Sequence, residues 1–270
     1  MKKKRLDVML VDNTLVESRS LAQRLIMAGQ VRVAGQVIYK PATMIEGEPE
    51  ITIEELPKYV SRGAEKLEGA LHGFGLTDLQ GLICADAGAS TGGFTDCLLT
   101  YGAARVYALD VGQNILHWKL RNDERVVVME GTNVRNQGSL PEAVDMVVID
   151  VSFISLEIVL PVVRGWLKDE NRGVVALIKP QFEAGRKEAA RGKGVIRDAR
   201  VHRDVLERTL QSAVREGYSV NGLIRSPLKG PKGNIEFLVY LHYPGDGVEN
   251  LAGWIERAMS DSGEEDDVSN

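Results

Sequence analysis

The sequence predicts an α/β fold in which a doubly wound, mostly parallel sheet forms the larger of two domains. From residue 82 onward, short apolar runs alternate with amphipathic segments, an alternation that is typical of βαβ units. The run at 145–150 is almost continuously apolar, as expected for a strand that is buried on both faces. A glycine-rich turn follows the run at 82–84, which predicts a ligand site at the carboxyl end of a central strand.

Composition limits the class of protein. The 270 residues, 44% hydrophobic and 26% charged, are typical of a globular chain with one large or two smaller domains. No apolar segment follows the basic start at 1–7, and four charged residues interrupt the most apolar region, 143–167, so we expect neither a signal peptide nor a membrane span. Cys84 and Cys97 lack the spacing of metal ligands. We therefore expect a cytoplasmic protein with no disulfide and no metal, taken as a monomer by default.

The net charge of −5 is unevenly distributed. Residues 1–40 carry eight Lys or Arg against three Asp or Glu, whereas 260–270 contain five acidic residues and no basic one. We expect this acidic tail to be disordered. Its negative charge offsets the positive charge of residues 1–40, so the net charge does not reveal that the front of the chain is basic.

The front of the chain, 1–58, predicts a compact basic module. A helix begins at Leu6, and Ser18 is a suitable N-cap for a second helix, whose apolar residues at 21, 22, 25 and 26 share one face. Gly29 ends this helix. A hairpin of 31–33 and 37–39 follows, and an extended segment ends near Ile53.

The residues of this module that match a known family are Arg5-Leu6-Asp7, Ser18-Arg19, Ile26, Gly29, Val31, Val33, Gly35 and Lys40-Pro41. With them, the module resembles the RNA-binding domain named after ribosomal protein S4. Ala34 stands where that family usually has Asn, which leaves the geometry of the hairpin turn open. The resemblance implies binding of structured RNA through its shape and backbone; the alternative is that the arginines only solvate a helix face. The candidate RNA contacts are Lys4, Arg5, Arg19, Arg24 and Lys40.

A boundary is predicted near 56–60, with a linker at 59–62, a second domain at 63–246, and a C-terminal helix and tail at 247–270. The second domain opens with a helix over 61–71. Its residues Leu67, Ala70 and Leu71 can pack inward, which leaves Lys66 to point elsewhere.

The turn after the first strand predicts a nucleoside site. We expect the strand to end at Cys84, with Asp86 after it and a helix over 94–99. The spacing is not that of a dinucleotide site, and an acidic residue before a short glycine loop suits S-adenosylmethionine; an ordinary α/β turn is the alternative. Asp110 ends the second strand, where a ribose diol finds its acceptor. The predicted cofactor residues are Asp86, Gly88, Ala89, Ser90, Gly92, Gly93, Phe94, Asp110, Asn133 and Asp150.

Polar residues also stand at the ends of later strands. Asp150 ends the fourth strand, Lys179 ends the fifth, and Glu236 begins the last, which we expect to pair with the strand before it as a hairpin. The carboxyl ends of parallel strands share one edge, so these three residues should meet, and Lys66 could reach them from the side. Taken alone, each of these residues could have a purely structural role, such as pairing with a neighbour on its own helix or loop.

Together these four residues resemble the Lys-Asp-Lys-Glu set of the FtsJ-like RNA 2′-O-methyltransferases. With the front module, the chain is similar to the TlyA (hemolysin A) family, which acts on cytidine in ribosomal RNA. The resemblance implies a Rossmann-like, seven-stranded domain that binds S-adenosylmethionine, with Lys66, Asp150, Lys179 and Glu236 as catalytic residues. The further matching segments are 61–64, 150–155, 179–183 and 194–198. A non-catalytic RNA-binding or ribosome-associated factor is the alternative, and nothing in the chain favours membrane lysis.

The chemistry gives these residues two possible arrangements of roles. Lys179 accepts the proton of the ribose hydroxyl, or Lys179 and Lys66 stay cationic and stabilise the developing alkoxide. Asp150 and Glu236 would hold the lysines in either case. The glycine-rich and basic segment 185–194 is either a solvated loop or a lid that contacts RNA phosphates. The candidate RNA contacts here are Arg62, Arg186, Lys187, Arg191 and Lys193.

Overall fold

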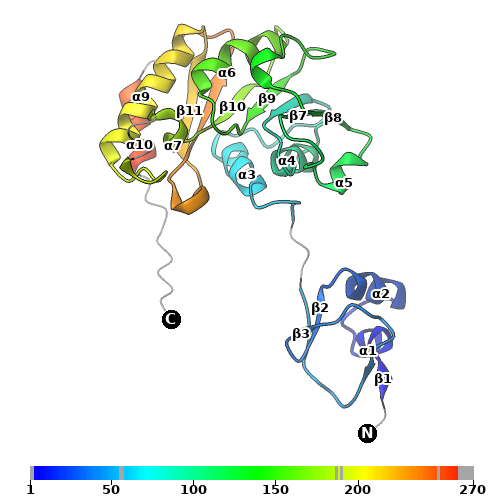
Figure 1. Cartoon of the computed structure of the whole chain (residues 1–270). Helices are drawn as coiled ribbons and strands as arrows, with labels where there is room; N and C mark the ends of the chain where they lie inside the picture. Colours follow the sequence, from blue (N-terminus) through cyan, green and yellow to red (C-terminus); the bar gives the residue numbers. More distant parts are fainter. Residues whose placement is uncertain (1–2, 55–57, 186–187, 189–190, 248–249, 261–270) are drawn as a thin grey trace. The chain divides into compact units, whose positions relative to one another are not determined.

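The computed structural model describes residues 3–54, 58–185, 188, 191–247 and 250–260, and the chain divides into two compact units, Met1–Lys58 and Tyr59–Asn270 (Figure 1). Arg186, Lys187 and the acidic tail at 261–270 lie outside the described residues. Among the described residues, no helix is long and apolar enough to cross a membrane.

The first unit is a small α+β domain. Helices α1 (Leu6–Asp12) and α2 (Arg19–Met27) pack on a three-stranded sheet of β3 (Gln36–Val37), β2 (Val31–Val33) and β5 (Ile51–Ile53), and β1 (Lys4–Arg5) pairs with β4 (Met44–Ile45). The hydroxyl of Ser18 accepts a hydrogen bond from the Leu21 amide, so Ser18 is the N-cap of α2 as predicted. The buried core includes Leu6, Leu10, Ala22, Ile26 and Val31.

The structure defines the geometry of the hairpin turn between β2 and β3, which the sequence left open at Ala34. Ala34 and Gly35 have φ values of 48° and 78°. Both therefore occupy the left-handed region that two-residue hairpin turns require. Ala34 adopts the conformation that Asn tolerates better, at a cost of about 1 kcal/mol.

The second unit is built on a seven-stranded sheet, in the order β11-β12-β10-β9-β6-β7-β8. Six strands run in one direction, and only β12 runs antiparallel, between β10 and β11, so the predicted final hairpin is confirmed. The strands are β6 (Ile83–Ala87), β7 (Arg105–Asp110), β8 (Val126–Glu130), β9 (Met146–Ile149), β10 (Gly173–Ile178), β11 (Ser219–Arg225) and β12 (Phe237–His242). The prediction that β6 ends at Cys84 was wrong, because pairing with β7 and β9 continues through Asp86 to Ala87.

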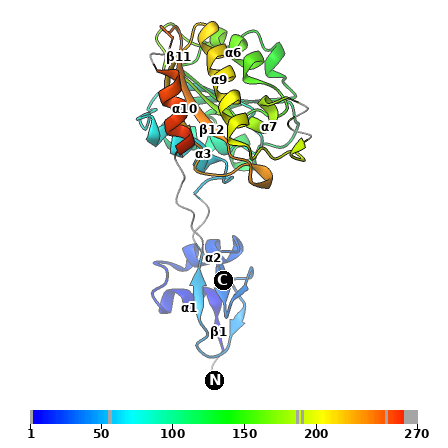
Figure 2. The same cartoon turned by 90° about the vertical axis from the view of Figure 1, so that its left-hand side faces the viewer.

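Helices cover both faces of this sheet, each over its own apolar cluster. Figure 2 shows α9 and α10 in front of the sheet. One face carries α3 (Ala64–Gly73), α4 (Gly93–Thr100) and α5 (Trp118–Arg121); the other carries α6 (Leu156–Val163), α9 (Ala199–Arg215) and α10 (Leu251–Ser260). The short helices are α7 (Pro180–Glu183), η1 (Val134–Asn136), η2 (Arg164–Trp166) and η3 (Pro231–Gly233). As predicted, Leu67, Ala70 and Leu71 of α3 are fully buried.

Candidate active site

The sheet register brings the predicted strand-end residues to one edge. Ala87 of β6 pairs with Ile149 of β9. Ile178, the last residue of β10, pairs with Phe237, the first residue of the antiparallel β12. Lys179 therefore leaves the sheet beside Glu236, and Asp150 leaves it one strand away.

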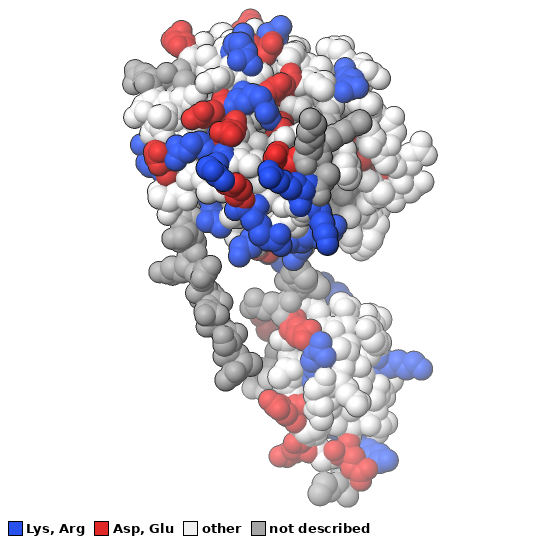
Figure 3. Space-filling view, turned by 60° about the vertical axis from the view of Figure 1, so that its left-hand side comes forward, with Lys and Arg blue, Asp and Glu red and all other residues white. Residues whose placement is uncertain are grey.

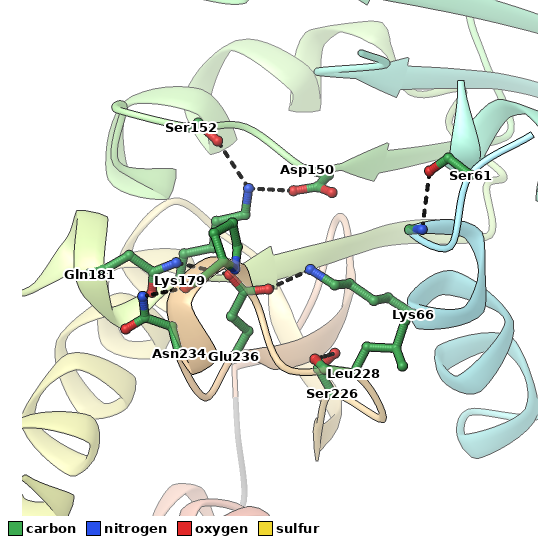
Figure 4. A network of polar contacts seen from close by, with 12 residues as sticks. Ser61, Lys66, Asp150, Ser152, Lys179, Gln181, Ser226, Leu228, Asn234 and Glu236 are labelled. Carbon is green, nitrogen blue, oxygen red and sulfur yellow. Dashed lines mark hydrogen bonds and ion pairs between the residues drawn. The ribbon is translucent and has the colours of Figure 1, made fainter. Parts of the chain in front are cut away.

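Four charged side chains form two ion pairs at this edge (Figure 4). Nζ of Lys179 lies 2.6 Å from Oδ1 of Asp150. Nζ of Lys66, which comes from α3, donates to Oε2 of Glu236 at 2.5 Å. Glu236 is 1% exposed and both lysines are 9% exposed, so each buried charge has an opposite charge beside it, as burial requires.

Neutral side chains complete the network. Lys179 also donates to Oγ of Ser152 at 3.1 Å, and Nε2 of Gln181 donates to Oε1 of Glu236 at 2.8 Å. Both carboxylate oxygens of Glu236 therefore accept a hydrogen bond. Sequence reasoning assigned no role to Ser152 or Gln181, although both lie in segments that carry the family resemblance.

The glycine-rich turn and the start of α4 line a pocket beside Lys179. The turn approaches β9 so closely that a Cβ on Gly88, which has a φ of +91°, would lie 2.5 Å from the carbonyl oxygen of Asp150. Gly88 is therefore required by chain packing as well as by the turn. The lining residues are Ser61, Gly63, Gly88, Ala89, Ser90, Thr91, Gly93, Phe94, Asp150, Ser152 and Lys179.

Asp86 lies beneath this pocket and does not line it. It is fully buried, and Oδ2 accepts a hydrogen bond from the hydroxyl of Thr95 at 2.6 Å. Burial raises the pKa of Asp86 to about 7. Among the described residues, Oδ1 of Asp86 has no hydrogen-bond partner.

The other predicted cofactor residues lie around the turn without lining the pocket. Asp110 ends β7, and its carboxylate accepts the amides of Ser90 at 2.8 Å and Gly112 at 2.7 Å. Asn133 caps η1 through a bond from the Arg135 amide. Gly92 packs against Leu120.

The end of β8 holds a structural carboxylate that sequence reasoning missed. Glu130 accepts the amides of residues 114, 115 and 116 and a bond from Arg121. These donors, Arg121 first, hold the pKa of Glu130 at about 2. Glu130 thereby fixes the loop that follows Asp110.

The candidate RNA contacts fall into two groups. Arg5 and Arg19 bond to Asp7, whose side chain is fully buried, and Lys4 pairs with Asp12. These hydrogen bonds, from Arg5 above all, hold the pKa of Asp7 well below its usual range. Arg191 lies 3.7 Å from Glu188. Arg24, Lys40, Arg62 and Lys193 are exposed, with no ion pair to any residue that the structure describes.

The fold and the paired lysines and carboxylates define an α/β methyltransferase unit joined to a small α+β unit. Comparison with known families agrees: the FtsJ-like methyltransferase model matches residues 59–243, and the S4 domain model matches 4–51. The chain belongs to the FtsJ-like methyltransferase family and is an S-adenosylmethionine-dependent enzyme.

Three similar proteins cover most of the chain. "Putative rRNA methyltransferase YqxC" of Bacillus subtilis is 49% identical, covering 92% of this chain and 89% of its own. The 16S/23S rRNA (cytidine-2′-O)-methyltransferase TlyA of Mycobacterium tuberculosis is 43% identical, covering 95% and 97%. A solved structure from Streptococcus thermophilus, described as a "putative hemolysin", is 42% identical over 96% of both chains, with a TM-score of 0.70.

The pocket fits the charges of S-adenosylmethionine. Asp150 lines the pocket, and its carboxylate suits a ligand that carries positive charge. The first amides of α4, which have no acceptor within the helix, suit its carboxylate. When bound, the cofactor supplies an electrophilic methyl group.

Proposed function

We propose that this enzyme methylates the ribose 2′-hydroxyl of a cytidine in ribosomal RNA. The single observation that carries the proposal is the presence of two ion pairs at one edge of the sheet: Lys179–Asp150, which lines the cofactor pocket, and the buried Lys66–Glu236. The substrate class is supported by the name of the Mycobacterium tuberculosis relative, and an RNA ligand by the S4 domain.

In this proposal, Lys179 acts on the reacting hydroxyl. It lines the pocket, where its Nζ donates to Oγ of Ser152 and lies 2.6 Å from Oδ1 of Asp150. A lysine nitrogen has three hydrogens when it is charged, and two hydrogens and a lone pair when it is neutral. One position on Nζ is left for the ribose oxygen. There the neutral amine would accept the hydroxyl proton, whereas the ammonium would donate to the oxygen and stabilise the negative charge that develops on it.

Lys66 and Glu236 act from the other side of the same edge. Glu236 is held by Gln181 as well as by Lys66, so the ammonium of Lys66 has a fixed position. A second fixed cation beside the reacting oxygen lowers the cost of its negative charge. Much of the rate comes from alignment of hydroxyl and methyl, which needs rigid neighbours.

An exposed aromatic ring offers a surface for the target base. Phe153 is 89% exposed, and its φ is +64°. The centroid of its ring lies 4.7 Å from that of Phe182, and Nζ of Lys179 lies over the Phe182 ring. A phenyl ring held in solvent by a strained backbone suits an unstacked base.

The test is methyl transfer to ribosomal RNA from a strain that lacks this gene. With labelled S-adenosylmethionine, we expect the wild type to methylate one or a few cytidines at the 2′-oxygen. Lys179→Ala should lose at least about 100-fold in kcat while it still binds the cofactor. The matched control is Lys168→Ala, which removes a lysine paired with Asp145 at 2.9 Å, and it should keep full activity.

Two results would contradict the proposal. An active Lys179→Ala variant removes Lys179 from the mechanism. A wild type that binds ribosomal RNA and transfers no methyl group is the non-catalytic factor that the sequence left open.

A further inference from the structure

The loop between β11 and β12, residues 226–236, lies over the catalytic carboxylate and carries lysines that the mechanism does not use. We propose that Lys229 and Lys232 on this loop bind the phosphate backbone of the RNA strand beside the target ribose. We further propose that Asn234 joins this loop to the segment 194–196 as one rigid rim. The inference rests on the proposed function and names a recognition surface for its substrate.

The loop is anchored directly on Glu236. A Cβ on Gly230 would lie 2.1 Å from Oε1 of Glu236, so the backbone of the loop packs against this carboxylate. The Ser226 amide donates to the Glu236 carbonyl at 2.9 Å, and the Gly230 amide donates to the Asn234 carbonyl at 2.8 Å. Whatever binds the loop is therefore bound next to the Lys66–Glu236 pair.

Asn234 connects the loop to a distant segment. It is 3% exposed. Its Oδ1 accepts the Ile196 amide at 3.0 Å, and its Nδ2 donates to the carbonyls of Gly194 at 2.9 Å and Pro231 at 3.0 Å. One buried side chain thus fixes both the β11–β12 loop and the end of the glycine-rich segment. Figure 4 shows where Asn234 lies relative to Glu236.

Four basic side chains are exposed on this rim. Lys229 and Lys232 stand on the loop, and Lys193 and Arg197 flank the segment that Asn234 holds; all four are exposed. Within the part of the chain that the structure describes, none of the four has a carboxylate in ion-pair distance. Lysine and arginine side chains gather toward one end of this face of the methyltransferase unit (Figure 3).

The backbone at Lys232 also indicates a functional surface. Its φ is +59°, a conformation that costs a lysine about 1 kcal/mol more than a glycine. The strain holds a cation outward beside the active site. Unpaired cations on a rigid rim suit phosphate oxygens, whose binding releases counterions from the nucleic acid.

The test compares two double variants of the full chain that lose the same charge. Lys229→Ala/Lys232→Ala removes the rim lysines. The control, Arg172→Ala/Arg215→Ala, removes two exposed basic residues that have no ion pair among the described residues; they lie at the start of β10 and the end of α9, away from the rim. Affinity for a ribosomal RNA fragment is measured over a range of salt concentrations, together with kcat, KM and cofactor affinity.

We expect the rim variant to raise KM for RNA about tenfold, to keep kcat within about twofold, and to leave cofactor affinity unchanged. The slope of log affinity against log salt should fall by roughly 1 for each lost phosphate contact, and the control should change neither. If both variants match the wild type, or both weaken binding equally, the inference is wrong while the proposed function stands. If the wild type transfers no methyl group to RNA, the proposed function itself fails.

A second variant tests whether Asn234 joins the β11–β12 loop to the segment 194–196. Asn234→Ala should speed amide hydrogen exchange in 194–197 and 228–233 together, with little change in the core strands. Faster exchange in only one of the two segments would show that Asn234 does not join them.

Discussion

At the scale of single residues, Asp86 makes the unfolding free energy depend on pH. Its carboxylate is completely buried below the glycine-rich turn, and Thr95 donates the hydrogen bond that it accepts from a side chain among the described residues. Because burial raises its pKa to about 7, the folded state binds a proton that the unfolded state releases near pH 4. The contribution of Asp86 to stability is therefore full below pH 4 and is lost as the pH rises to about 7.

Asp86→Asn should remove this loss. Relative to the wild type, the variant should gain on the order of 3 kcal/mol of unfolding free energy between pH 4.5 and pH 8. Denaturant unfolding followed by tryptophan fluorescence measures it, because all three tryptophans lie in the second unit. The exposed Asp204→Asn is the control. A pH-independent difference between wild type and Asp86→Asn would show that this carboxyl does not carry the raised pKa.

Residues also show what the sequence could predict. Asp150, Lys179 and Glu236 were predictable as a cluster because strand ends share an edge, which is a rule of topology. The bonds of Arg5 and Arg19 to Asp7 were not, because nothing local indicates that Asp7 is buried. The structural role of Glu130 was not predictable either, because its partners are backbone amides of a separate loop.

At the scale of elements, the start of α6 holds the loop that carries Ser152 and Phe153. Oε1 of the buried Glu183 on α7 accepts the Leu156 amide at 2.9 Å, and Oε2 accepts from the Ser155 hydroxyl at 2.6 Å. Burial raises the pKa of Glu183. Sequence reasoning gave α7 no role, because a four-residue helix has no periodicity to detect.

Glu183→Ala should leave the first turn of α6 without its acceptor. We expect a loss of about 2 kcal/mol in unfolding free energy and a lower kcat, since the loop that positions Ser152 against Lys179 loosens. Glu183→Gln keeps an acceptor for the Leu156 amide and should restore most of both. Glu157→Ala, on the exposed side of the same turn, should change stability by less than about 0.5 kcal/mol. A stable Glu183→Ala variant with wild-type kcat would disprove this role.

At the scale of the whole molecule, the proposed function requires that two units with separate cores bind the same RNA. The chain divides between Lys58 and Tyr59, and each unit has its own buried apolar cluster or clusters. Binding RNA through both units raises the local concentration of the target at the catalytic edge without any change in the chemistry. The charges of the first unit should therefore affect KM, and those of the catalytic edge should affect kcat.

Arg24→Ala/Lys40→Ala in the full chain tests this division. Both residues are exposed and have no ion pair to any described residue, so their loss should leave folding intact. We expect KM for ribosomal RNA to rise about tenfold, with kcat at saturating RNA and the melting temperature unchanged. Arg19→Ala is the contrasting variant: it takes a partner from the buried Asp7 and should also destabilise the first unit, by about 1–2 kcal/mol. Single-turnover rates measured against RNA concentration separate the effect on RNA binding from the effect on the catalytic step. A loss of rate that saturating RNA does not restore would mean that the first unit takes part in the catalytic step, and an unchanged KM would mean that these two side chains do not touch the RNA.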